Sequence, residues 1–407
     1  MRVLHTSDWH LGRSLYGKKR YAEFEAFLNW LSNLIATERV DVLLVAGDIF
    51  DTSTPSNRAQ ELYYRFLCKV TTICQHIIII GGNHDSPSFI NAPQQLLKTL
   101  HIHVQGEADE NPADEVILLD DAANTPLAII CAVPYLRDKD LRKAEAGESQ
   151  EDKNSKMIAG LAEHYATVAD TARKLQQTAG KIPIIGMGHL FTAGGKTIQD
   201  DGVRELYVGS LAHINTEVFP DCFDYLALGH LHVAQNAGNV DRFRYSGSPL
   251  PIGFGEAEQD KKVLIIDFEE NNLLITEHIV PRFQRLKQIK GDLEFITSQI
   301  NNLKEIKSPA WLEIIYNGDS RALNLRQTIE DAVADTELEV LSIKNELVIS
   351  QILSSPQLHE TLDDLDKDDV FTRCLEVNNI SEEHRQQLWQ CYKTILQNMQ
   401  EEDGNRE

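Results

Sequence analysis

Five short motifs in this chain carry side chains of the kind that bind metal ions. They combine carboxylate, imidazole and amide groups, and none contains a thiolate. Such ligands suit manganese, iron or zinc in a reactive site and disfavour a structural zinc site. In chain order they are Asp8 and His10 in DWH, Asp48 in GD, Asn83 and His84 in GGNHD, His189 in GMGH, and His230 and His232 in GHLH.

The size of this set indicates more than one ion. Seven candidate ligands, leaving His84 aside, are too many for a single ion. Two ions about 3.5 to 4 Å apart, bridged by a carboxylate, would use them all. Such a pair holds a phosphoryl group and activates water for in-line attack. We therefore expect two divalent ions and phosphoester chemistry. Asp51 and Asp85, in the same motifs, are expected to cap helices or to orient the histidines.

The motifs follow apolar runs of strand length, which explains how distant residues could meet. The run Val42–Ala46 is continuous and aliphatic, as in a central parallel strand covered on both faces. Asp48 comes directly after it and Gly47. Because parallel strands present equivalent ends at one edge of a sheet, we expect the motifs to converge there, with Asp48 as the bridge. Strands are predicted at 3–6, 42–46, 76–80, 127–131, 182–186, 225–228, 243–246 and 263–268.

Amphipathic helices are predicted between these strands. One carries Phe24, Phe27 and Leu31 on a single face, and another follows Ser56. The segment 137–156 is rich in charges of both signs, so we expect an exposed loop or helix there. Alternating strands and helices of this kind indicate a layered α/β domain, which we place at residues 1–280.

Two further regions follow. Residues 281–350 alternate helix and strand patterns and predict a small α/β domain. Residues 351–407 begin with an acidic linker and continue with two amphipathic helices, one marked by Phe371 and Leu375 and the other by Leu388 and Tyr392. Two helices alone cannot bury both apolar faces. Their pattern is compatible with folding back on the body and with holding a partner.

Composition limits the class of protein. The net charge of -23 excludes nucleic-acid binding through a broad basic face, so a phosphate substrate must be held by metal ions, a local basic loop or a partner. The six cysteines form no CxxC pair, which is typical of a reduced compartment. The N-terminus lacks the organisation of a signal peptide, and no apolar run is long enough for a membrane span. We expect a cytoplasmic protein with no membrane partner.

The ordered set DxH, GDxxD, GNHD, GH and GHxH resembles the calcineurin-like metallophosphoesterase family. HTSDWHLG, VAGDIFDT, ALGHLH and YSGSPLP extend the resemblance toward the nuclease subunits of that family, along essentially the whole chain. It implies a β-sandwich flanked by helices, with a small α/β capping domain and a C-terminal helix pair. It further implies that Asp8, His10, Asp48 and His232 hold one ion, and Asp48, Asn83, His189 and His230 the other. His84 would act on the leaving oxygen, and the family's preferred ion is Mn²⁺.

The resemblance also implies a substrate and partners. The substrate would be DNA, cut by a 3'-to-5' exonuclease on duplexes and an endonuclease on single strands and hairpins. The partner would be an ATPase with a long coiled coil, docked by the C-terminal helices, and the nuclease domain would dimerise. From the residues alone, the loop GRSLYGKKR offers Arg13, Lys18, Lys19 and Arg20 for backbone phosphates.

Two other classes of function remain open from the sequence. The same metal site could serve a small-molecule phosphatase or a cyclic nucleotide phosphodiesterase, because a fold alone does not specify a substrate. The additional domains argue against this alternative. A non-catalytic scaffold on the same fold would show lost ligands, and all eight motif positions are intact.

Overall fold

The computed structural model describes residues 1–143, 145, 147–192, 195, 214–269, 272–318 and 324–346, with a few positions between 371 and 393. The chain divides into two compact units, Met1–Gln284 and Arg285–Glu407.

The first sheet of the N-terminal unit delivers three of the predicted motifs. Its order is β14-β13-β1-β4-β5-β6. The four strands β1, β4, β5 and β6 are parallel, and β13 and β14 add antiparallel pairs at one edge. Their bounds are Arg2–Thr6 for β1, Val42–Ala46 for β4, His76–Ile80 for β5, Ile102–Gln105 for β6, Lys262–Glu269 for β13 and Asn272–Ile279 for β14.

The second sheet delivers the other two motifs. Its order is β11-β12-β10-β9-β8-β7, and β8, β9, β10 and β12 run parallel. The bounds are Val116–Asp120 for β7, Pro126–Ala132 for β8, Ile184–His189 for β9, Tyr225–Gly229 for β10, Gln235–Asn236 for β11 and Phe243–Tyr245 for β12.

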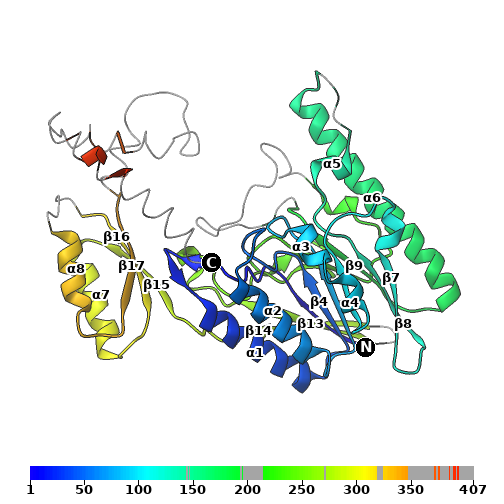
Figure 1. Cartoon of the computed structure of the whole chain (residues 1–407), viewed down its shortest axis with the longest axis horizontal. Coiled ribbons are helices and arrows are strands. Elements are labelled where there is room, and N and C mark those ends of the chain that lie inside the picture. The colour runs from blue at the N-terminus through cyan, green and yellow to red at the C-terminus, as the bar shows by residue number, and fades with distance from the viewer. Residues whose placement is uncertain are drawn as a thin grey trace. The chain divides into compact units, whose positions relative to one another are not determined.

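The two sheets pack face to face. One buried cluster joins side chains of the first sheet, such as Val42 and Leu44, to side chains of the second, such as Ile130 and Met187. The outer face of the first sheet is covered by α1 (Tyr21–Glu38) and α2 (Asn57–Val70), and that of the second by α6 (Gln150–Ala179). Figure 1 shows these helices outside the sheets. The predicted layered α/β fold is confirmed.

Short elements connect these layers. They include the hairpin of β2 (Ser14–Leu15) and β3 (Lys18–Lys19) and the helices α3 (Pro87–Asn91), α4 (Gln94–Lys98) and α5 (Asp138–Leu141). Single turns of 3-10 helix lie at Pro112–Glu115, Thr216–Val218 and Phe254–Glu256.

The C-terminal unit contains a parallel sheet of its own, in the order β15-β16-β17 within the described residues. Two helices pack on it through a small core that includes Ile289, Ile300 and Leu312. The bounds are Leu286–Gly291 for β15, Leu293–Glu305 for α7, Trp311–Tyr316 for β16, Leu325–Val333 for α8 and Glu339–Asn345 for β17.

Most of the predicted linker and C-terminal helix pair, 351–407, lies outside the described residues. Among the positions that are described, Phe371 stacks on Tyr392 with ring centroids 4.1 Å apart. No helix in the described part of the chain is both long enough and apolar enough to cross a membrane.

Candidate metal centre

The strand ends of both sheets bring the motif residues together. Asp8 follows β1, Asp48 follows β4, and Asn83 with His84 follows β5, all in the first sheet. His189 is the last residue of β9 and His230 follows β10, in the second sheet. Apart from the half-buried Asn83, these side chains are almost completely buried. Residues more than two hundred positions apart therefore share one enclosed site.

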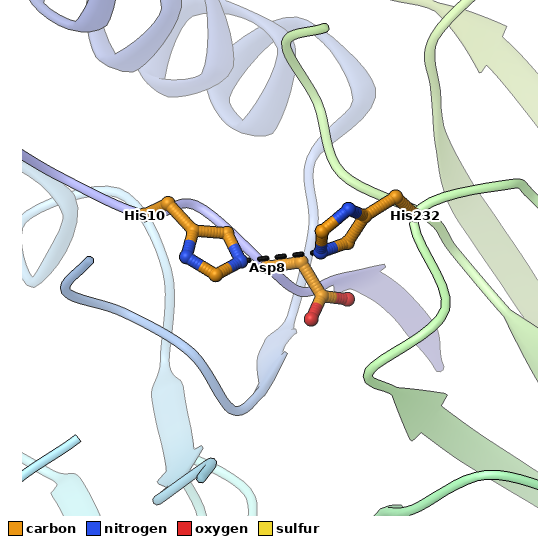
Figure 2. Close-up of side chains that lie close together, drawn as sticks. All are labelled: Asp8, His10 and His232. Atoms are coloured by element: carbon orange, nitrogen blue, oxygen red, sulfur yellow. Dashed lines mark hydrogen bonds between the residues drawn. The ribbon is translucent and has the colours of Figure 1, made fainter. Parts of the chain in front are cut away.

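The first cluster consists of Asp8, His10 and His232, whose ligand atoms all lie within 4.8 Å of one another. Figure 2 shows the two imidazoles facing each other beside the carboxylate of Asp8. The Nε2 atoms of His10 and His232 are 3.2 Å apart. The backbone N–H of His230 donates to both carboxylate oxygens of Asp8, at 3.0 and 3.1 Å, which fixes the orientation of that carboxylate.

The second cluster consists of Asp48, His189 and His230, also within 4.8 Å of one another. The amide oxygen of Asn83 joins it, 3.0 Å from His189 Nε2 and 3.3 Å from His230 Nδ1. Asp48 also groups with His10 and His84 within the same distance. Its carboxylate thus lies between the two clusters, where a bridging ligand would have to be.

The contacts of His189 show that this site is built for positive charge. Its Nδ1 donates to the carbonyl of Ala46 at 2.9 Å, so a neutral ring presents a lone pair at Nε2. That lone pair faces two oxygen acceptors, Asn83 Oδ1 at 3.0 Å and Asp48 Oδ2 at 3.4 Å. Three facing lone pairs repel unless a proton or a metal ion lies between them. The donor set therefore fits a divalent cation.

The electrostatics of the site also favour positive charge between these side chains. Burial opposes the ionised form of Asp48, yet the imidazoles of His189 and His10 hold the pKa of its carboxyl well below the usual range. Burial also opposes the charged form of His189, but the Asp48 carboxylate raises its pKa to about 9. At Asp8 burial prevails and raises the pKa of the carboxyl. Buried carboxylates of this kind require a compensating positive charge.

The backbone at the site is held in an uncommon conformation. Four of the predicted ligands have positive φ angles, which cost non-glycine residues about 1 to 3 kcal/mol each and tend to occur at functional sites. They are Asp8 at 53°, His10 at 48°, Asp48 at 51° and His230 at 99°. Gly82 lies against Asp48 so closely that a Cβ there would overlap the carboxylate. The backbone after these strands is therefore strained, and this conformation directs the side chains toward the shared site.

Contacts behind the ligands steady the two loops that carry Asp48 and His84. The Asp85 carboxylate accepts hydrogen bonds from the backbone N–H of Ile49 and Phe50, at 3.1 and 3.0 Å, and from Gly82 at 2.9 Å. His84 Nδ1 donates to the carbonyl of Asp51 at 2.8 Å. Because this bond keeps a proton on Nδ1, any proton that the His84 ring exchanges is carried by Nε2.

The predicted phosphate-binding residues lie in different surroundings. Lys19 is exposed and Lys18 partly exposed on the β2–β3 hairpin. Arg13 pairs with Asp51 at 2.9 Å. Arg20 is 2% exposed and its guanidinium is held by Glu23, at 2.8 and 3.0 Å, and by the Pro251 carbonyl at 2.7 Å. These contacts bury the Arg20 guanidinium and give it a structural role.

Sequence reasoning missed several buried partners of the ligands. Ser7 Oγ donates to Asp8 at 2.5 Å and contacts Ser246 Oγ at 2.8 Å. Glu256 lies 3.5 Å from His232 Nδ1. The motif YSGSPLP contains Ser246, but no local pattern distinguishes Glu256 from the other acidic residues of its loop.

Comparisons with known proteins agree with this geometry. Residues 1–234 match the family model described as calcineurin-like phosphoesterase, and residues 282–379 match one described as type 5 capsule protein repressor C-terminal domain. The SbcD subunit of the SbcCD nuclease from Escherichia coli K12 is 34% identical over 97% of this chain and 98% of its own length. That of Rhodobacter capsulatus is 37% identical over 66% of each chain.

A solved structure of a dimetal phosphatase from Danio rerio is 12% identical, with a TM-score of 0.36, and covers 69% of this chain and 97% of its own. The family model that spans more than half of the chain, and a relative similar along its whole length, show the kinship directly. The chain belongs to the calcineurin-like phosphoesterases, which use divalent metal ions, and within them to the SbcD family of nuclease subunits.

Proposed function

We propose that this protein is the nuclease subunit of an SbcCD-type complex and hydrolyses phosphodiester bonds in DNA. Its activities would be 3'-to-5' exonuclease on duplex ends and endonuclease on single strands and hairpins, in DNA end processing during recombination, repair and replication. One observation carries the proposal: Asp48 lies between two buried clusters of metal-ligating side chains, in a chain similar over its whole length to the SbcD nuclease subunit.

The proposed ligand sets are Asp8, His10, Asp48 and His232 for one ion, and Asp48, Asn83, His189 and His230 for the other. Ions bound there would supply Lewis-acid activation of the phosphoryl group and a nucleophilic water. We propose Mn²⁺, the ion that the family resemblance implies; a ligand set of imidazole, carboxylate and amide oxygen is compatible with Mn²⁺ but does not by itself select it over iron or zinc. The cytoplasm is the proposed compartment.

His84 is the proposed proton donor to the leaving oxygen. Because its Nδ1 donates to the Asp51 carbonyl at 2.8 Å, its Nε2 would carry the proton that is transferred. Its backbone N–H donates to Asp48 Oδ1 at 2.9 Å, which ties the position of the ring to the bridging carboxylate. A positioned donor of this kind contributes about 10²- to 10⁴-fold in rate.

Few residues of this acidic chain are available to contact the DNA backbone. Lys18, Lys19 and Arg13 lie close in the chain to His10 and are the proposed contacts to backbone phosphates. The ATPase subunit, SbcC, with its long coiled coil, would provide the remaining contacts to DNA. The complex would be a heterotetramer that contains a dimer of nuclease domains. This arrangement is compatible with the net charge of -23.

A nuclease assay tests the proposal. The purified chain is incubated with Mn²⁺ and end-labelled linear duplex or hairpin DNA, with and without the ATPase subunit and ATP, beside an Asp48→Asn control. We expect Mn²⁺-dependent shortening from the 3' end and hairpin opening, both absent in the control. Cleavage of a chromogenic phosphodiester without any cleavage of DNA, even with the partner, would contradict the nuclease proposal.

The partner proposal has its own test. Deleting residues 355–407 should abolish co-purification with the ATPase subunit, because the apolar faces of the C-terminal helices are the proposed docking element. Mn²⁺ binding by calorimetry should be unchanged, since all proposed ligands lie in the N-terminal unit. Association that survives the deletion would place the docking site elsewhere.

A further inference from the structure

Beyond the proposed ligands, a buried carboxylate contacts one of them from behind. Glu256 is fully buried at the end of the 3-10 turn Phe254–Glu256. Its loop joins β12 to β13 and passes behind the GHLH motif, where Ser248 and Lys261 contact the His232 carbonyl. Burying a carboxylate is costly unless its partners compensate for the lost water, so the partners of Glu256 reveal its role.

The two carboxylate oxygens of Glu256 have different surroundings. Oε2 is paired with Lys261 Nζ at 2.5 Å and accepts the backbone N–H of Ile252 at 3.0 Å. Within the described part of the chain, Oε1 makes no hydrogen bond of ordinary geometry. The imidazole Nδ1 of His232 lies 3.5 Å from Oε1. Oε2 is thus bound by Lys261 and the backbone of its own loop, whereas Oε1 faces the imidazole of His232.

Lys261 ties this carboxylate to the backbone of the same histidine. Its ammonium, 6% exposed, donates to the His232 carbonyl at 3.0 Å as well as pairing with Glu256. The backbone N–H of Ser248 donates to that carbonyl at 3.2 Å. Gly247 permits this close approach: its φ is +75°, and a Cβ there would lie 2.8 Å from the His232 carbonyl oxygen. The β12–β13 loop therefore holds both the backbone and the ring of His232.

We propose that Glu256, held by Lys261, is a positioning residue that fixes His232 with Nδ1–H toward the carboxylate and Nε2 toward Asp8 and His10. Carboxylates that orient a metal-ligating histidine in this way set its tautomer and raise its basicity. The observed 3.2 Å between His232 Nε2 and His10 Nε2 agrees with this orientation. The inference rests on the proposed metal site and adds a role that the ligand motifs do not contain.

The chain offers a matched control. Glu115 is also fully buried, and its Oε2 lies 2.8 Å from Nε2 of His164, a histidine outside both ligand clusters. Both pairs combine a buried carboxylate with an imidazole in the same unit. Glu115→Gln therefore reproduces the loss of a buried charge beside a histidine without touching the metal centre.

The experiment measures Mn²⁺ binding to the full chain by calorimetric titration, for wild type, Glu256→Gln and Glu115→Gln. We expect Glu256→Gln to weaken one of two binding events by about 10- to 100-fold and to leave the other unchanged. Glu115→Gln should bind both ions as the wild type does. Equal binding by Glu256→Gln and wild type would overturn the inference while leaving the proposed function in place. A wild type that binds no Mn²⁺ would instead overturn the proposed function.

Two further measurements keep the test decisive if the single variant does not fold. Because Glu256→Gln leaves a buried ammonium without its counter-charge, the double variant Glu256→Gln/Lys261→Met removes both charges together and should show the same selective weakening. In the wild type, ¹⁵N NMR of the metal-free chain, at a pH where His232 is neutral, should show the proton on Nδ1. A proton on Nε2 would overturn the inference.

Discussion

An aspartate lies within two residues of the end of a parallel strand in both units, and the two aspartates have different surroundings. Asp48 follows β4 and Gly47 in the N-terminal unit; Asp292 follows β15 in the C-terminal unit. Asp48 is 1% exposed and lies among four histidines that come from the strand ends of both sheets. Asp292 is exposed, and its carboxylate accepts the backbone N–H of Phe295 at 2.8 Å, capping helix α7.

The comparison shows that a parallel strand end does not by itself make a reactive site. In the C-terminal unit a helix begins at once, so its first N–H groups satisfy the carboxylate. In the N-terminal unit the chain turns away through positive φ angles, and Asp48 is left facing the ends of a second sheet. The two aspartates differ because a helix N-terminus follows one strand end, whereas the strand ends of a second sheet face the other.

The largest effect is expected from removing the charge of Asp48. Asp48→Asn should slow cleavage by about a thousandfold, because the bridging carboxylate serves both proposed ions. Metal ions of this kind stabilise the transition state by several kcal/mol, and a loss of about 4 kcal/mol corresponds to that factor in rate. Asp292→Asn should cleave at the wild-type rate. Rates on duplex DNA with Mn²⁺ check both. Comparable losses in the two variants would remove the distinction between the strand ends.

His84→Ala separates catalysis from metal binding within the N-terminal unit. We expect turnover to fall by about 10²- to 10⁴-fold, because a proton donor is lost, while the number of Mn²⁺ ions bound stays the same. Single-turnover rates and metal content after dialysis measure the two quantities. Loss of metal together with turnover would make His84 a ligand.

Metal removal should affect the stability of the two units differently. An ion that binds only the folded state stabilises it by about 2.7 kcal/mol at a hundred times its dissociation constant. Chelation should therefore lower the unfolding temperature of the N-terminal unit and leave hydrogen exchange in α7 and β16 unchanged. Protection lost equally in both units would show that the metal effect is not confined to the proposed site.

The smallest effect concerns the capping aspartate. Asp292→Ala should lower the free energy of unfolding of its unit by about 1 kcal/mol, as the loss of an N-cap does. Denaturant titration measures this, with Mn²⁺ binding as the control. A change in Mn²⁺ affinity in this variant would contradict the assignment of a purely local role to Asp292.

Much of the fold could be predicted where burial is continuous. The strands Val42–Ala46 and His76–Ile80 have the predicted bounds because every residue in them is buried, which leaves an unbroken apolar run. The strand β14 was not predicted, because all eight of its residues are exposed or half-buried and so leave no continuous apolar run. Helix α6 begins at Gln150, inside the segment expected to be a loop or exposed helix, since its first turns are solvated.

The convergence of the motif residues at one site could also be inferred, because ligands at the ends of parallel strands have few other places to meet. The contacts behind them could not. Glu256 reaches His232 from a loop 24 residues away and leaves no periodic pattern, and Arg20 is held by the carbonyl of Pro251, which lies 231 positions away in the chain. Such contacts depend on packing rather than on local sequence.

The two-ion site can be tested in a crystal of the full chain grown with Mn²⁺ and measured at a wavelength where manganese scatters anomalously. We expect two anomalous peaks about 3.5 to 4 Å apart with the Asp48 carboxylate between them, one beside Asp8, His10 and His232 and the other beside Asn83, His189 and His230. A single peak, or peaks away from Asp48, would contradict this arrangement.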